Sequence, residues 1–301
     1  MKLDRVLAID KPSGLTSHDV VSRLRRSTGV RRIGHAGTLD PAATGVLVIL
    51  IGKATRLSQF IVDTEKEYRG SIVLGTSTDT HDAEGSVLSE RPVEGLDERR
   101  LRRAMNEFTG RIEQVPPMTS AVKRDGRPLY ELARKGVVVE RKPRPITIHS
   151  FEFLRYEEPR LEFALVCSKG TYVRRLAHDL GERLGTGAHL AELVRTRVGR
   201  FSLEQASPLS EVEDLKSDLT EVGLTMFDAL SRWPALLLHD EEAESVVFGG
   251  SIRVEDDRTA AGPGDHLRLT EDGRQLLAVG RVEGAERGGK DIRPVKVFET
   301  P

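Results

Sequence analysis

The sequence has little of what secreted, membrane-bound or cysteine-based metal proteins require. It contains one cysteine, Cys167, among 301 residues, so neither an internal disulfide nor a cysteine-based zinc site is expected. No apolar run approaches the roughly eighteen residues of a membrane span. The first residues lack the apolar segment of a signal peptide. These absences predict a cytoplasmic protein with no membrane attachment.

Net charge is also small, at −1, yet the charged residues are unevenly distributed. Residues 1–60 carry ten Lys and Arg against four Asp and Glu, and residues 123–149 carry eight against three. Residues 211–244 carry two against ten. A basic RNA-binding face on an otherwise neutral protein fits this distribution. Uneven surface charge without any partner fits it too.

A glycine-rich stretch at residues 34–45 (GHAGTLDPAATG) precedes a wholly apolar run. Its glycines predict a tight turn or the close approach of another segment. Pro41 disfavours helical backbone at Asp40, and the apolar run at residues 46–51 predicts a buried strand. A carboxylate on a constrained loop beside such a strand suits a nucleophile or a base. An Asp-Pro turn without chemistry explains the same residues.

The stretch GHAGTLDP at residues 34–41, with Thr44 and Gly45 behind it, resembles the signature loop of the TruB family of tRNA pseudouridine synthases. The similarity continues in DKPSGLTSH at residues 10–18, SKGTYVRR at 168–175 and the segment 187–199. The resemblance implies isomerisation of one uridine in the T-loop of tRNA, at position 55, to pseudouridine. The target base is flipped out of its stack, and an Asp acts as nucleophile. This reaction neither oxidises nor hydrolyses, so no cofactor is expected.

The resemblance implies three catalytic residues. Asp40 matches the catalytic Asp, Arg174 matches the Arg that pairs with it, and Tyr68 matches the aromatic residue that stacks on the target base. The local sequence supports the pairing, because Arg174 lies in the first turn of a predicted helix, off its apolar stripe. A cation there is disfavoured by the helix dipole, so an anionic partner is expected. We therefore expect the Arg174 guanidinium within hydrogen-bonding reach of the Asp40 carboxylate, with Tyr68 lining the same site.

Four further residues are implied to bind the substrate: His35, Tyr172, Leu193 and Lys11. Tyr172 and Leu193 would wall the uracil site, His35 would fill or brace the gap left by the flipped base, and Lys11 would contact backbone phosphate. Without the resemblance, Leu193 is an ordinary core residue. Asp40 could attack the sugar C1′ or take a proton from C2′, and the sequence leaves both routes open.

Two stretches invite other chemistry and do not fit it. The loop at residues 78–85 (TDTHDAEG) gathers three acids and a histidine but lacks the spacing of an EF-hand or an HExxH helix, so a polar loop without metal is expected. The segment 45–53 contains a Gly-Lys pair without the earlier glycine of a phosphate-binding loop.

The order of predicted elements indicates an α+β protein with two domains. Residues 1–230 are expected to form a pseudouridine synthase fold, a mixed and mainly antiparallel sheet flanked by helices. A basic, turn-rich insertion at about 116–145 resembles the family's RNA-gripping thumb, although a solvated hairpin explains it as well. Residues 233–301 are expected to form a small β-rich, PUA-like RNA-binding domain. Its strands are predicted at residues 252–254, 266–270, 276–282 and 294–298.

The expected partner is the T-arm of tRNA, bound by a monomer that needs no obligate protein partner. Two alternatives remain open. The chain could be a related synthase acting on another RNA, including the guide-dependent dyskerin branch. It could also be a non-catalytic RNA-binding or tRNA-folding protein on the same fold.

Overall fold

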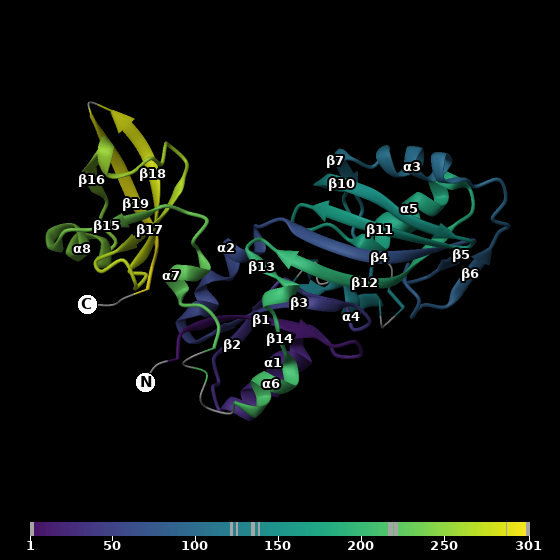
Figure 1. The fold of residues 1–301 in the computed structure, drawn as a ribbon, viewed down its shortest axis with the longest axis horizontal. Helices are drawn as coiled ribbons and strands as arrows, with labels where there is room; N and C mark the ends of the chain where they lie inside the picture. The colour runs from purple at the N-terminus through teal and green to yellow at the C-terminus, as the bar shows by residue number, and fades with distance from the viewer. Residues whose placement is uncertain are drawn as a thin grey trace.

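The computed structural model describes residues 3–120, 123–124, 126–133, 136–137, 139–215, 219, 222–286 and 288–298. Within these residues a large mixed sheet is flanked by helices, and a smaller C-terminal sheet lies to one side of it (Figure 1). This arrangement confirms the expected α+β class. Among the described helices, none has the length and apolar character that a membrane crossing requires.

The strands of the large sheet are β1 (Arg5–Lys11), β2 (Ile33–Ala36), β3 (Thr44–Ile51), β4 (Lys66–Leu74), β7 (Gly110–Gln114), β10 (Arg144–Glu157), β11 (Arg160–Cys167), β12 (Ala188–Val198), β13 (Phe201–Ser202) and β14 (Ser207–Pro208). Their order is β14-β1-β3-β12-β4-β11-β10-β7, with β2 added to β3 and β13 to β12. Neighbours are antiparallel except β1 with β14 and β3 with β12. The sheet is thus mainly antiparallel, as expected.

The helices that accompany this sheet are α1 (Ser17–Thr28), α2 (Ser58–Val62), α3 (Glu98–Asn106), α5 (Val173–Leu184), α6 (Leu209–Asp214) and α7 (Met226–Ala229). The first of them shows how local sequence sets its ends. Thr16 and Asp19 form a capping box, which supplies partners for backbone amides that the first turn leaves unpaired. Gly29 ends the helix in a left-handed conformation that costs glycine little.

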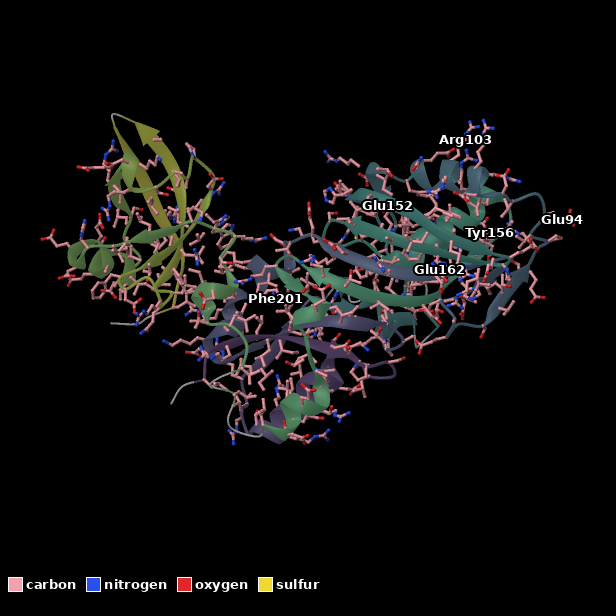
Figure 2. The ribbon with its side chains drawn as sticks, viewed as in Figure 1. Glu94, Arg103, Glu152, Tyr156, Glu162 and Phe201 are labelled. Atoms are coloured by element: carbon pink, nitrogen blue, oxygen red, sulfur yellow. The ribbon has the colours of Figure 1, made fainter. Side chains whose placement is uncertain are left out.

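Buried apolar side chains of α1, α3 and α5 pack on one face of the large sheet and form its first core. The opposite face of β10 and β11 carries charged side chains such as Glu152 and Glu162 (Figure 2). Cys167 belongs to the first core, where burial raises the pKa of its thiol to about 11. It is therefore a packing residue.

Strand β3 is buried on both faces. Leu47, Ile49 and Ile51 lie in the first core, whereas the alternate residues Val46, Val48 and Leu50 lie in a second core with α2 and α7. The second core also contains Leu276, Val279 and Phe298 from the C-terminal part of the chain. This double burial explains why residues 46–51 are uninterruptedly apolar rather than alternating.

The C-terminal sheet has the order β15-β17-β18-β19-β16 and its own core. Its elements are β15 (Ala235–Leu237), α8 (Asp240–Val247), β16 (Ile252–Glu255), β17 (His266–Thr270), β18 (Ala278–Glu286) and β19 (Gly289–Val297). Two of its strands run further than predicted because β18 and β19 form one long hairpin. The short strand β15 was missed, since three residues after Trp233 and Pro234 show no measurable alternation.

Two predictions upstream need correction. The apolar residues Leu57, Phe60 and Ile61 predict a helix over residues 54–62. The structure instead has a 3-10 helix, Gly52–Leu57, followed by α2. His35 lies on strand β2 rather than on the loop, because Ile33–Ala36 pairs with β3.

The remaining described elements are two hairpins and a short helix: β5 (Thr76–Thr78) with β6 (Val87–Glu90), β8 (Lys123–Arg124) with β9 (Arg127–Pro128), and α4 (Leu129–Ala133). The second hairpin and α4 lie in the expected insertion at 116–145. The side chains of Lys123, Arg124 and Arg127, which carry much of its charge, are outside the described part of the structure.

Candidate active site

Asp40 lies on the loop between β2 and β3, and that loop is held from the side of α1. Ser17, at the start of α1, donates its hydroxyl to the Leu39 carbonyl at 3.1 Å and accepts the Leu39 amide at 2.9 Å. The Gly14 amide donates to the Pro41 carbonyl at 2.9 Å, and Leu39 itself is buried. The residues on both sides of Asp40 are therefore fixed by buried contacts.

Arg195 of β12 holds the same loop from the other side. Its fully buried guanidinium donates to the carbonyls of Gly37 at 3.0 Å, Thr38 at 3.2 Å and Val46 at 2.7 Å. Gly45, with a φ of +94°, lets β3 approach so closely that a Cβ there would lie 2.3 Å from the Arg195 carbonyl oxygen. The sequence prediction of a close approach is confirmed at Gly45, but the role of Arg195 was missed.

Arg174 makes the ion pair that was expected with Asp40. Its Nε lies 2.9 Å from Asp40 Oδ2, and its Nη2 donates to Asp40 Oδ1 at 3.1 Å, which is the two-pronged geometry of a guanidinium on a carboxylate. Arg174 is 6% exposed, whereas the Asp40 side chain is 40% exposed. The Arg174 side chain is thus a buried support for the Asp40 carboxylate, which still faces outward.

A second carboxylate, Asp82, completes the arginine's partners. Its Oδ2 accepts from Arg174 Nη1 at 3.2 Å, and the same nitrogen donates to the Thr119 hydroxyl at 2.7 Å. The sequence showed Asp82 only as one acid of the polar loop 78–85. Its pairing could not be predicted, because it depends on that loop folding back onto α5. The anionic partner that the helix dipole demanded is therefore two carboxylates.

The charges around Asp40 oppose one another. Burial raises the pKa of the Asp40 carboxyl above its ordinary value, and the neighbouring Asp82 raises it further. The Arg174 guanidinium is the strongest influence in the other direction, followed at longer range by Lys11. Removal of the Arg174 charge would therefore leave the pKa of Asp40 still higher.

Tyr68 lies on β4 opposite Arg195 of β12, and its side chain is 8% exposed. Burial raises the pKa of its phenol, and the nearby Asp40 carboxylate acts in the same direction. Tyr68 is consequently a neutral phenol whose hydroxyl group lies within the electrostatic reach of Asp40. The expected contact between Arg174 and Asp40 is confirmed, whereas the place of Tyr68 in the same site stays a prediction.

Of the four expected substrate-binding residues, Tyr172 is tied most directly to this region, and the roles of Leu193 and His35 stay predictions. Tyr172 caps α5, its backbone held by the side-chain amide of Gln114 at 2.8 and 3.1 Å, and Asp40 and Arg174 both influence its half-buried phenol. Leu193 lies on β12 opposite Gly70 of β4 and is buried in the first core. His35 is partly buried, and burial lowers the pKa of its imidazole, so it is neutral at neutral pH.

Lys11 is not placed to contact phosphate, and that expectation is corrected. It is fully buried, and its ammonium group donates to the carbonyls of Leu15 at 2.7 Å, Pro12 at 2.9 Å and Pro41 at 3.1 Å. Burial lowers the pKa of the ammonium group to about 8, with Asp40 the largest influence that raises it. Lys11 therefore fastens the Asp40 loop to the end of β1 from within.

Replacement of Lys11 by Met is expected to lower the free energy of unfolding by about 1–3 kcal/mol, because three partly buried carbonyls lose their donor. Denaturant titration measures the loss, with the exposed Arg31→Met as a control that should stay close to the parent. The salt dependence of RNA binding should not change. Unchanged stability together with a weaker salt dependence would instead restore a phosphate contact for Lys11.

Comparison with solved structures places this arrangement among known folds. A chain in the crystal structure of a Cbf5-Nop10-Gar1 complex superposes with a TM-score of 0.75 at 28% identity, covering 98% of this chain and 85% of that one. A chain in a structure of an H/ACA RNP bound to a substrate RNA containing 2′-deoxyuridine gives 0.73 at 26% identity, over 98% and 85%. The large sheet is that of the pseudouridine synthase fold.

Matches to family models and to named relatives identify the family within this class of protein. A model described as TruB family pseudouridylate synthase (N terminal domain) matches residues 25–173, and one described as tRNA pseudouridylate synthase B C-terminal domain matches residues 174–229. The chain is 56% identical to a tRNA pseudouridine synthase B of Opitutus terrae, over 71% of this chain and 89% of the relative. It is 42% identical to the one of Geobacter sulfurreducens, over 98% and 100%. The chain belongs to the TruB family.

Proposed function

We propose that this enzyme isomerises the uridine at position 55, in the T-loop of tRNA, to pseudouridine, with Asp40 as its catalytic carboxylate. The observation that carries the proposal is the two-pronged contact between Arg174 and an outward-facing Asp40 beside the buried Tyr68. Relatives named tRNA pseudouridine synthase B, at 42–56% identity, support tRNA as substrate over the guided RNA targets of the dyskerin branch.

The reaction breaks the bond between uracil N1 and sugar C1′ and forms a new one from C1′ to C5. Asp40 serves it either by attack on C1′, giving a glycosyl ester, or by removal of the C2′ proton, giving a glycal. The detached uracil turns in place and C5 bonds to C1′. In the ester route the Asp40 carboxylate leaves C1′ as this bond forms, and in the glycal route Asp40 returns its proton to C2′. In both routes the proton lost from C5 is balanced by the proton gained at N1. Both routes require an ionised Asp40 and a base that has left its stack.

The other side chains divide the remaining work. Arg174 keeps Asp40 ionised and oriented, and Asp82 in turn holds Arg174. Tyr68, whose phenol has a pKa raised by burial, stacks on the uracil. Tyr172 and Leu193 wall the base, and His35 fills the gap that the flipped base leaves.

We further propose residues 1–230 as the catalytic domain, with an RNA-gripping insertion at about 116–145, and residues 233–301 as a PUA-like RNA-binding domain. The separate core of the C-terminal sheet supports that division. The insertion is tied to the site, because Thr119 at its start binds Arg174. We propose that the chain acts as a cytoplasmic monomer on the T-arm of tRNA.

The test of this function is incubation with an unmodified tRNA transcript, followed by mapping of pseudouridine at every position. Modification confined to position 55, and lost when that uridine is replaced by cytidine, is the expected result. A transcript of the T-arm alone tests whether the arm suffices. Absence of pseudouridine despite tight tRNA binding would favour the non-catalytic alternative, and modification of other RNAs only would favour another substrate.

Neutralisation of Lys123, Arg124 and Arg127 together is expected to weaken tRNA binding and to reduce its salt dependence. Each lost phosphate contact should lower the slope of log K against log salt by roughly 0.7–0.9. Filter binding between low and physiological salt measures the slope. A matched triple change in the acidic segment 211–244 should leave it in place, and equal effects of the two triples would contradict a phosphate-binding insertion.

A further inference from the structure

A pair of stacked histidines lies beside Arg174 and takes no part in the chemistry described above. His81 belongs to the loop 78–85 that carries Asp82, and His178 belongs to α5. Their ring centroids are 4.1 Å apart and their planes differ by 11°, a face-to-face contact. Both rings are partly buried, and neither Nδ1 has a hydrogen-bond partner. The two rings thus meet face to face where each leaves a buried Nδ1 without a hydrogen bond.

The backbone at His81 is held in an unusual conformation. Among the described residues, His81 is the one residue other than glycine that has a positive φ, at +64°. Such a conformation persists where the surroundings over-determine it. Two hydrogen bonds help to do so: the His81 amide donates to the Thr78 carbonyl at 3.3 Å, and the Leu190 amide of β12 donates to the His81 carbonyl at 3.0 Å. The turn is thereby aimed so that the ring of His81 meets α5.

On α5, His178 follows Arg174 by four residues, so the two side chains lie one turn apart on the same face of the helix. The loop meets both of them. Asp82 and the Thr80 carbonyl bind Arg174 at 3.2 and 3.3 Å, and the His81 ring covers His178. One loop is thus fastened to one helix at two neighbouring points, a polar one at the arginine and an aromatic one at the histidine.

The surrounding charges keep the stack neutral. Burial lowers the pKa of His81 to about 3, and the cationic groups that face it are Arg174 and Arg175 of α5 and Arg141. Burial and Arg175 also lower the pKa of His178, against Asp179 and Glu182 on its own helix. Two neutral imidazoles stack without charge repulsion, so the contact is intact throughout the neutral range.

We propose that the His81–His178 stack is a positioning device for the reaction. The stack holds the loop 78–85 against the turn of α5 that carries Arg174. Asp82 and the Thr80 carbonyl of that loop then fix the plane of the Arg174 guanidinium, and the guanidinium in turn orients the carboxylate of Asp40. The inference rests on the proposed function of the same site. Neither imidazole touches the substrate, so both are positioning residues.

The test uses the full chain and four variants: His178→Ala, His178→Phe, His81→Gly and the double His81→Gly/His178→Ala. Glycine at position 81 removes the ring while suiting the positive φ, and phenylalanine at position 178 keeps a stacking ring without nitrogen. The measurements are the single-turnover rate of pseudouridine formation at saturating enzyme, the Kd for tRNA and the midpoint of unfolding. His149→Ala on β10, a histidine paired with Glu65, is the matched control.

His178→Ala and His81→Gly should each lower the single-turnover rate by about 3- to 10-fold, the worth of one aromatic pair, with the Kd unchanged. The double variant should lose no more than either single one, because both remove the same contact. His178→Phe and the control should keep the parental rate. Rescue by phenylalanine and a split between rate and Kd are not expected from a role in stability alone.

A parental rate in His81→Gly, an equal loss in His178→Phe and His178→Ala, or additive losses in the double variant would each overturn the stack as a positioning device. Rate losses that follow the midpoint of unfolding would overturn it as well. These outcomes leave the proposed function standing, because the parent is active in all of them. A parent that binds tRNA and forms no pseudouridine would overturn both.

Discussion

Asp40→Asn is expected to lower the rate of pseudouridine formation on the order of 10⁴-fold or more, the scale seen when a member of a catalytic unit is removed. The amide keeps the size of the side chain but has neither the negative charge that attacks C1′ nor the basicity that would remove the C2′ proton. The loop should keep its shape, because Ser17, Arg195 and Lys11 bind its backbone rather than the carboxylate. The affinity for tRNA should therefore stay close to that of the parent.

The measurement is single-turnover pseudouridine formation with saturating enzyme, beside a binding titration on the same preparation. Asp63→Asn is the matched control, since Asp63 is an exposed acid whose partner is Lys169 and exposed pairs contribute little. A near-parental rate for Asp40→Asn would remove Asp40 from the reaction. Loss of tRNA affinity in parallel with the rate would show that the substitution had disturbed the fold instead.

Arg174→Lys and Arg174→Gln separate the geometry of the arginine from its charge. Lysine keeps the charge but cannot reproduce the planar fork that reaches Asp40 with two nitrogens and Asp82 with a third. We expect a loss on the order of 10²-fold in rate, about 2.7 kcal/mol, with little change in the pH profile. Glutamine should lose more, because breaking a buried ion pair leaves its partners uncompensated.

The pH profile of the Arg174→Gln variant tests the direction of the shift in the pKa of Asp40, in addition to the size of the rate loss. Burial already raises the pKa of Asp40, and Arg174 is the strongest influence that lowers it. Without that charge the pKa rises, so a larger share of Asp40 is protonated at a given pH. Since the carboxylate is the active form, the acidic limb of the rate profile should move to higher pH. A limb that stays in place or moves to lower pH, measured against Arg175→Lys as control, would contradict the pairing.

Much of this structure could be predicted because the deciding interactions are local. Thr16, Asp19 and Gly29 define both ends of α1 within the helix and its nearest neighbours. The apolar run of β3 announces a strand buried on both faces. Arg174 predicts an anionic partner because a lone cation at a helix N-terminus is unfavourable. The partner expected for it, Asp40, is observed.

The missed or corrected residues depend on contacts that no local pattern encodes. Lysine is ordinarily a solvated side chain, and only the return of the chain at Pro41 buries Lys11 and supplies its acceptors. Arg195 looks like any other charge on a strand, and its acceptors are carbonyls some 150 residues away in sequence. Asp82 needs the 78–85 loop to reach α5. The short strands β2 and β15 owe their pairing to neighbours rather than to their own composition.

The double burial of β3 has a consequence for how the enzyme fails when it is heated. Asp40 is joined through three residues to the strand whose alternate side chains belong to both cores, so the acid shares its anchorage with the most protected part of the sheet. A loop attached in this way should not unfold locally at temperatures below the one at which the sheet itself unfolds. The enzyme should therefore lose its activity when the whole molecule unfolds, so heat inactivation should follow the global unfolding transition rather than local unfolding of the Asp40 loop.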